Sequence, residues 1–498
     1  MGTKDQLHTN MDNRTNVGSK SIHHEKNEFR MVLIKIYRFF FDVLLFYLAW
    51  IWFRYRCLFG MPAEGFRYNY YVTIVYAVLL YWFKNTFHAD TFGYYRIRTI
   101  ALAQFLSQVT VCMAVYFGVS IAWQKLKNPW VFVVLLSAQA LIDIAWAYFG
   151  SIYYQRIYPK KRTLLIYRND LDKKRFGATR GKPMERLYEI VDELKYDGSF
   201  HELEPKLKDY DAFFVAGVNS RCRNGILKYS KRNEIPCFVL PHIGDAIMQE
   251  AIHIQSFDSP VLYVNRTYVD PLYALVKRTF DIVVSGLALI ILSPLMLITS
   301  LVIVLYDRGP AWYKQVRLTK DGKEFKIIKF RSMRVDAEKD GVARLSSGEN
   351  DDRITPVGRV IRKLRIDELP QLINIFRGEM SVVGPRPERP EIAEQYYEKM
   401  PDFKLRLQVK AGLTGYAQIY GRYNSDPYEK LEFDLFYINQ MSLTTDFQLC
   451  FATLLTFFSK DNTKGIEEGQ TTALSDEANE PIIDYEEVNG GDSPEADE

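Results

Sequence analysis

The sequence lacks the patterns that define several common protein classes. Its five cysteines are scattered along 498 residues with no pair at metal-ligand spacing, which argues against a disulfide framework or a cysteine-based zinc site. No zinc-finger, basic-heptad or RNA-binding signature occurs, so nucleic acid is not an expected partner. The first residues contain no apolar core of a signal peptide, and Gln6 replaces the Ser or Thr of an N-myristoylation motif.

Positive charge is missing from the end of the chain. From Glu467 to Glu498 there are many carboxylates and no Lys or Arg, a composition that predicts a disordered acidic tail over residues 461–498. The polar residues 1–29 are predicted to be a disordered leader. The formal net charge of +4 is therefore the sum of an acidic tail and a clearly basic remainder. A basic remainder is expected for a protein at an anionic membrane surface that handles phosphorylated substrates.

Residues 157–260 lack the glycines of a dinucleotide-binding loop. Short apolar strands are predicted at 163–167, 212–216 and 237–240, alternating with helices at 184–196 and 221–232. The turn after the first strand is Arg168-Asn169-Asp170, whose backbone cannot approach a pyrophosphate closely. We interpret this segment as a degenerate Rossmann-like α/β module for regulation or assembly, with ligand binding as the minor alternative.

Long apolar runs, in contrast, are frequent between residues 30 and 156. Four stretches, at 31–53, 70–87, 99–123 and 130–155, each approach the ~20 residues needed to cross a bilayer, with Tyr and Trp at their ends. They predict a four-helix transmembrane bundle; four soluble core helices are the alternative. The basic residues after the fourth stretch place the following domain in the cytoplasm. Asp42 and Asp143 lie inside two of the spans and are expected to be hydrogen-bonded within the bundle.

A further apolar segment, at about 281–305, is interrupted by Ser293-Pro294. Proline removes a backbone hydrogen bond and kinks a helix. Both flanks of the segment are basic, whereas a spanning helix would leave one basic flank outside. The segment therefore predicts a re-entrant membrane helix broken at Pro294 with both ends cytoplasmic; a kinked fifth crossing is the alternative.

Two adjacent carboxylates, Asp367 and Glu368, follow a basic run and precede Pro370, which suits only the first turn of a helix. The helix dipole and the neighbouring cations are expected to keep both carboxylates ionised at neutral pH. An ionised Asp can act as a nucleophile, and a second carboxylate can hold Mg²⁺. An acidic first turn with surface ion pairs is the simpler interpretation of such a pair taken alone.

Cations cluster elsewhere in residues 261–460. Lys329 and Arg331 share a face of a predicted strand and could bind a phosphate together, and Arg317 lies in a nearby basic segment. Two prolines stiffen the backbone around Arg386, which lowers the entropy cost of presenting its guanidinium to an anion.

From about Tyr273 to Lys460 the sequence resembles the catalytic domain of the monotopic polyprenyl-phosphate phosphoglycosyl transferases, the bacterial sugar transferase family. The matching motifs, in family order, are KRTFD at 277–281, the Ser293-Pro294 break, YKQVR, KFRSM, DELPQL, MSVVGPRPE, KAGLTG and GRYN. With the preceding spans and α/β module, the chain resembles the large form of the family: a membrane α/β multidomain protein with an α-rich catalytic domain at 261–460.

The resemblance implies a transferase of the bacterial inner membrane that starts exopolysaccharide, capsule or O-antigen synthesis. Asp367 would attack a UDP-sugar, releasing UMP and forming an aspartyl-phosphosugar that passes to polyprenyl (undecaprenyl) phosphate. Glu368 would bind Mg²⁺, and Arg362, which matches a family arginine, could hold a phosphate. The candidate phosphate ligands found above are Lys329, Arg331, Arg317 and Arg386, and Asp434 matches another family acid.

Other interpretations stay open. A non-catalytic membrane scaffold or sensor should have lost the acidic pair or its cations, and a polytopic transferase would need more intramembrane acids than Asp42 and Asp143. The sugar of the donor, hexose or N-acetylhexosamine, is not determined by these residues. A homodimer through the α/β module is also left open.

Overall fold

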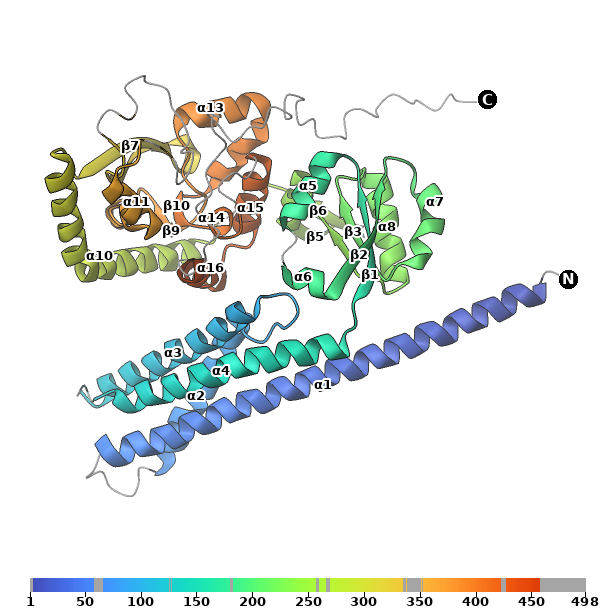
Figure 1. Cartoon of the computed structure of the whole chain (residues 1–498), viewed down its shortest axis with the longest axis horizontal. Helices are drawn as coiled ribbons and strands as arrows, with labels where there is room; N and C mark the ends of the chain where they lie inside the picture. The colour runs from blue at the N-terminus through green and yellow to red at the C-terminus, as the bar shows by residue number, and fades with distance from the viewer. Residues whose placement is uncertain are drawn as a thin grey trace. The chain divides into compact units, whose positions relative to one another are not determined.

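The computed structural model describes most of the chain, and its contacts divide the protein into two units, Met1–Leu240 and Pro241–Glu498. Figure 1 shows the helices and strands of each unit. The described residues are 3–57, 66–124, 126, 128–179, 182–256, 259–265, 269–334, 337, 351, 353–421 and 427–456. The predicted acidic tail lies outside them, as do Arg422, Tyr423 and Asn424 of the GRYN motif.

The first unit begins with four helices that lie alongside one another (Figure 1). They are α1 (Thr3–Cys57), α2 (Phe66–Thr86), α3 (Ile97–Ala122) and α4 (Trp130–Ile157). Each contributes to one apolar core, for example through Phe46, Tyr76, Val111 and Phe132. Among the described residues of the chain, three helices are long and apolar enough to cross a membrane: α3, α4 and a third in the second unit. Membrane crossing by α1 and α2 stays a prediction.

Helix α1 begins at Thr3, within the segment predicted to be a disordered leader. The structure gives a helix there instead. Residues 3–29 contain no proline, so nothing in their covalent structure interrupts the helix that continues into the apolar residues.

Charged side chains inside the bundle are paired with one another. Asp42 contacts Lys84 Nζ at 2.6 Å and Arg38 Nη1 at 2.7 Å, and Arg38 also contacts Asp143. All four residues are buried. Two positive and two negative charges thus neutralise each other, as expected for ions removed from water. The expectation that Asp42 and Asp143 are hydrogen-bonded within the bundle is confirmed.

The α/β module contains a parallel four-stranded sheet in the order β2-β1-β3-β4. Its strands are β1 (Lys161–Tyr167), β2 (Tyr188–Lys195), β3 (Ala212–Ala216) and β4 (Cys237–Val239). The predicted helix at 184–196 is wrong, because the helix α6 (Lys182–Leu187) ends where β2 starts. Residues 188–195 pair with β1 at the edge of the sheet, and this long-range pairing overrides the local helix preference.

Alternate residues of the central strands face opposite layers. Leu164 and Phe213 pack with α7 (Phe200–Leu203), the 3₁₀ helix η2 (Glu204–Asp209) and α8 (Ser220–Arg232). Leu165 and Phe214 pack with α5 (Asp170–Thr179) and α6. At the carboxyl end of β3, a Cβ on Gly217 would lie 1.9 Å from the carboxylate of Asp172. An acidic side chain therefore occupies the edge where a nucleotide phosphate binds in Rossmann folds, which supports the degenerate interpretation.

The second unit is built around a long helix, α10, from Pro271 to Asp307. It contains Pro294, and Figure 1 shows that α10 bends sharply part-way along its length. Other helices of this unit are α9 (Ile243–Gln249), α11 (Pro356–Lys363), α12 (Gln371–Arg377), α13 (Pro390–Lys399), α14 (Tyr416–Ile419), α15 (Pro427–Asn439) and α16 (Leu443–Thr456), with 3₁₀ helices η3 (Lys320–Gly322), η4 (Ile366–Glu368) and η5 (Pro401–Gln408).

Six short strands complete the described part of the second unit. They are β5 (Ile252–Ser256) with β6 (Ser259–Tyr263), β7 (Trp312–Leu318) with β8 (Glu324–Phe330), and β9 (Ser381–Val383) with β10 (Gly412–Thr414). The first two pairs are antiparallel and the third is parallel. A shared core joins β8, β9, α12, α13, α15 and α16. The part of α10 before Pro294, its first arm, packs against this core, and the part after Pro294 is its second arm. The predicted boundary between the α/β module and the catalytic domain, at 260/261, stays a prediction, since contacts divide the chain at Leu240.

Candidate active site

The two adjacent carboxylates lie in the short helix η4, between α11 and α12. Pro370 is the N-cap of α12, so Asp367 and Glu368 stand just ahead of the helix, as predicted. Their neighbours Ile366 and Leu369 are partly buried against Met296 and Ile303 of the second arm of α10. Apolar packing on both sides of the pair therefore fixes the turn that carries it.

Three cations surround the carboxylate of Glu368. Lys329 Nζ lies 3.5 Å and Arg386 Nη2 3.3 Å from its Oε1, and Arg365 Nη1 lies 3.7 Å from its Oε2. The side chain of Glu368 is 13% exposed, so these charges interact with little screening by water. The phosphate ligands predicted at Lys329 and Arg386 thus meet at the acidic pair, although the two belong to different elements.

The two carboxylates have opposite pKa shifts. Burial and the charge of Glu368 raise the pKa of Asp367 to about 6, against the opposing effects of Lys329 and Arg362. Burial also acts to raise the pKa of Glu368, but Lys329, Arg386 and Arg365 outweigh it and hold that pKa well below its usual range. Both groups are mainly ionised at pH 7, as expected, but the pKa of Asp367 is raised overall, because burial and Glu368 outweigh the surrounding cations. Arg362 is one of the cations whose charge acts to lower the pKa of Asp367.

Lys329 lies near the end of strand β8, and one buried asparagine fixes that strand in place. Asn374 of α12 accepts a hydrogen bond from the Ile328 N–H (3.0 Å) and donates to Lys326 O (2.9 Å). These bonds fix β8 against the helix that follows the acidic pair. Burial lowers the pKa of Lys329, while Glu368 acts to raise it.

Arg386 lies in a loop at 384–388, the arginine loop, that packs directly against the backbone of residues 410–415. A Cβ at Gly412 would lie 2.1 Å from Gly384 N, so both glycines are required for the close approach of the GPRPE and KAGLTG motifs. The Gly384 N–H donates to Thr414 O at 2.8 Å. The structure thus stacks two motifs that are far apart in the sequence.

Asp434 does not join the acidic pair. It lies on α15, is 2% exposed, and pairs with Arg406 Nη2 at 2.7 Å. Burial raises its pKa to about 6, opposed by Arg406. The same guanidinium donates to the carbonyl of Arg386 at 2.8 Å. Asp434 therefore supports the loop that carries Arg386 indirectly, through Arg406.

Arg406, Lys430 and Glu388 were missed as functional candidates from the sequence. Lys430 Nζ lies 3.6 Å and Arg406 Nη1 3.7 Å from Glu388 Oε1. Burial acts to raise the pKa of Glu388, but Lys430 and Arg406 lower it overall. The spacing of Lys430 and Asp434, one helical turn apart, was a signal that they share a face. No comparable pattern marked Arg406, which lies in the irregular η5.

Two predicted phosphate ligands lie further from the pair. Arg317 donates to Pro387 O (3.2 Å) and to Gln315 Oε1 (2.6 Å), beside the arginine loop, and its charge acts on Lys329. Arg331 is buried, and its guanidinium lies over Gly309, where a Cβ would be 2.3 Å from Nη1. Arg331 therefore packs against the segment that leaves α10.

Among the described residues, no group of three or more His, Cys, Asp or Glu side chains could hold a metal ion. Asp367 and Glu368 offer two neighbouring carboxylates. Mg²⁺ commonly takes one or two carboxylates together with water and substrate phosphates, so this donor set fits a shared site but not an all-protein cage.

Comparison with known proteins assigns this domain to a family. Residues 272–460 match the family described as bacterial sugar transferase. The exopolysaccharide production protein PSS of Rhizobium leguminosarum bv. phaseoli is 39% identical over 188 residues, which cover 36% of this chain and 93% of that protein. The chain belongs to the bacterial sugar transferase family. This confirms the resemblance seen in the motifs.

Two longer relatives of the bacterial sugar transferase family match the same part of the chain. One is the UDP-N-acetylgalactosamine-undecaprenyl-phosphate N-acetylgalactosaminephosphotransferase of Aeromonas hydrophila, 41% identical over 192 residues (38% of this chain, 45% of that protein). The other is the UDP-glucose:undecaprenyl-phosphate glucose-1-phosphate transferase of Klebsiella pneumoniae, 41% identical over 207 residues (41% and 42%). The match spans less than half the length of either relative.

Proposed function

We propose that the protein transfers a sugar-1-phosphate from a UDP-sugar to polyprenyl (undecaprenyl) phosphate and releases UMP. The observation that carries this proposal is the pair Asp367 and Glu368 amid Lys329, Arg365 and Arg386, within a bacterial sugar transferase domain. The named relatives use UDP-sugars and undecaprenyl phosphate. One relative is named for exopolysaccharide production, and we assign this chain to the first step of such a synthesis, or of capsule or O-antigen synthesis.

The chemistry consists of two displacements at one phosphorus. A carboxylate oxygen of Asp367 attacks the phosphorus that carries the sugar, the bond to the bridging oxygen breaks, and UMP leaves with the electron pair. An oxygen of the polyprenyl phosphate then attacks the same phosphorus. The bond to Asp367 breaks, and its carboxylate is regenerated.

The cations around the pair bind and orient the diphosphate. Lys329 and Arg386 already converge on Glu368, so phosphate oxygens of a substrate can replace this carboxylate as their partner. Arg362, Arg317 and Arg331 are the outer candidates. Mg²⁺, when held by Glu368 and the substrate phosphates, supplies further neutralisation of the diphosphate charge.

The exposed surface of α10 supports a membrane location for this reaction. Its apolar residues Ile290, Ile291, Leu297 and Leu305 are each 70–72% exposed, on a helix that contains Pro294 and bends part-way along its length (Figure 1). We propose that α10 enters one leaflet of the inner membrane and returns, which leaves the acidic pair at the cytoplasmic surface where a lipid phosphate is accessible.

The test is UMP release from a panel of UDP-sugars by the full chain, with undecaprenyl phosphate and Mg²⁺. We expect release with one or a few sugars, and at least a thousandfold loss in Asp367→Asn, which keeps the size of the side chain but removes its nucleophilic charge. Asp402→Asn, on the exposed start of η5, is the matched control and should retain wild-type activity.

Trapping separates this proposal from its alternatives. A phosphosugar adduct on the Asp367 peptide, found by mass spectrometry after donor is added without acceptor, is the expected result. Normal turnover by Asp367→Asn would exclude the proposed nucleophile. No UMP release from any donor would instead favour a scaffold or sensor.

A further inference from the structure

The KRTFD motif at 277–281 lies on the first arm of α10, apart from the acidic pair, and its polar side chains reach two elements of the active site. We propose that Lys277, Arg278 and Asp281 form a clamp that fixes the Arg386 loop relative to the acidic pair, so that the membrane helix itself sets the geometry of phosphate binding. This inference rests on the proposed function.

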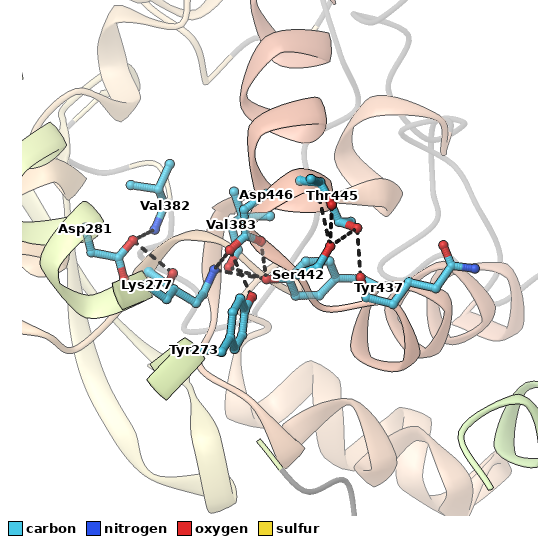
Figure 2. Close-up of polar contacts among 12 residues, drawn as sticks. Tyr273, Lys277, Asp281, Val382, Val383, Tyr437, Ser442, Thr445 and Asp446 are labelled. Atoms are coloured by element: carbon cyan, nitrogen blue, oxygen red, sulfur yellow. Dashed lines mark hydrogen bonds and ion pairs between the residues drawn. The ribbon is translucent and has the colours of Figure 1, made fainter. Parts of the chain in front are cut away.

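One side of the clamp holds strand β9. Asp281 Oδ1 accepts a hydrogen bond from the Val382 N–H (2.9 Å), as Figure 2 shows. It accepts a second from Ser381 Oγ (3.1 Å). Asp281 is 3% exposed, so these bonds are shielded from water. Val382 is not one of the paired residues of β9 and β10, and its N–H depends on Asp281. Since β9 leads directly into Gly384-Pro385-Arg386, Asp281 fixes the base of the arginine loop.

The far end of β9 is held by a second group of side chains (Figure 2). Tyr437 Oη lies 3.2 Å from Val383 O and 2.8 Å from Asp446 Oδ1, the two acceptors within reach of its single proton. Lys277 Nζ donates to Tyr437 Oη (3.0 Å) and Asp446 Oδ2 (2.7 Å), and Tyr273 donates to Asp446 Oδ2 (2.9 Å). Asp446 is buried, so its charge requires Lys277. The first arm of α10 thus secures both ends of β9.

The other side of the clamp holds α12. Arg278 donates from Nη1 to Ile375 O (2.7 Å) and from Nη2 to Phe376 O (2.8 Å), carbonyls of the last turn of that helix. A guanidinium suits this place because its fork matches two acceptors and its charge opposes the negative end of the helix dipole. Helix α12 starts three residues after Glu368, so Arg278 fixes the element behind the acidic pair.

The two sides converge on one ion pair. Arg278 and Asp281 are three residues apart on α10, and they hold α12, which follows Glu368, and β9, which precedes the loop of Arg386. The distance of 3.3 Å between Arg386 Nη2 and Glu368 Oε1 is therefore set from a single turn of the membrane helix. These are positioning residues, because no contact joins them to the acidic pair itself among the described residues.

The test compares Arg278→Lys with Arg377→Lys in the full chain. Lysine keeps the charge but cannot bind two carbonyls in a fork. We expect UMP release to fall about ten- to a hundredfold in Arg278→Lys, because small displacements of binding groups have large effects on rate. Arg377, exposed at the same end of α12, should tolerate lysine. In a double-mutant cycle with Arg386→Lys, the two losses should be strongly non-additive.

A second measurement does not depend on activity. Hydrogen–deuterium exchange in residues 381–386 should accelerate in Asp281→Ala and stay near wild type in Asp281→Asn, because an amide oxygen can accept both bonds made by Oδ1. Equal exchange in all three proteins, or an additive cycle with an active wild type, overturns the clamp. An inactive wild type that shows the expected exchange overturns the proposed function and leaves the clamp standing.

Discussion

The reactivity of Asp367 depends on the balance between its burial and the charges around it. Burial and Glu368 raise its pKa to about 6, whereas Lys329, Arg362 and Arg365 act to lower it. The attacking form is the carboxylate. The rate of UMP release should therefore rise as pH increases through about 6 and level off above 7.

Removal of one cation should move the rising, low-pH part of this profile, its acidic limb. In Arg365→Met the positive charge that favours ionised Asp367 is lost, so the pKa of Asp367 rises and the limb shifts to higher pH. The measurement is the pH profile of kcat/KM for the donor. Lys363→Met removes an exposed cation two residues away and should leave the limb in place. A limb that moves to lower pH in Arg365→Met would contradict the assignment of the titrating group to Asp367.

Individual residues were predictable where the chemistry is local in sequence. Asp367, Glu368 and Pro370 are neighbours, so their arrangement followed from helix-start rules. The convergence of Lys329 and Arg386 on Glu368 depends on long-range packing through Asn374 and through Gly384 against Gly412. Arg331 was placed on the same face as Lys329 by strand alternation, but β8 ends at Phe330 and the next side chain turns to Gly309.

Between elements, the buried pair of Arg406 and Asp434 ties η5 to α15 beneath the arginine loop. Arg406→Met leaves Asp434 and Glu388 buried with fewer partners and frees the Arg386 carbonyl. Loss of one partner of a buried pair typically costs roughly 3–5 kcal/mol. We expect a decrease of that size in the free energy of unfolding in detergent.

The matched control is an ion pair in the same domain with one exposed partner. Arg389 Nε lies 3.7 Å from Glu391 Oε2, and the Glu391 side chain is 62% exposed. Glu391→Gln should change the unfolding free energy by less than about 1 kcal/mol, since water screens such pairs. Equal stability of Arg406→Met and wild type would show that the buried pair has no structural role.

Element types followed from the sequence where apolar periodicity was long. Helices α2, α3 and α4 were predicted close to their observed bounds, as were β1, β3, β4 and α8, whereas α1 and α10 begin well before the apolar runs that predicted them. Strand β2 was missed because Tyr188–Lys195 is polar and lies at the edge of its sheet, so its assignment depends on pairing with β1. The small sheet of β9 and β10 was also missed, because strands of three residues are too short to show a periodic pattern.

At the scale of the whole molecule, the path of α10 decides where the second unit lies. Its apolar surface and central proline were evident in the sequence, but a kinked crossing and a re-entrant hairpin share both features. Cysteine labelling in intact cells distinguishes them. In a cysteine-free background, Asn265→Cys lies before α10 and Lys323→Cys lies after it, both at exposed positions.

We expect neither cysteine to react with a membrane-impermeant maleimide until the cells are permeabilised, because both flanks of a re-entrant helix are cytoplasmic. Asn128→Cys, in the exposed turn before α4, should react in intact cells if all four bundle helices cross. Pro294→Ala restores a backbone hydrogen bond and should favour a straight helix. Labelling of Lys323→Cys should then appear in intact cells, whereas labelling of that site with Pro294 present would show that α10 crosses the membrane and would move the acidic pair away from its cytoplasmic donor.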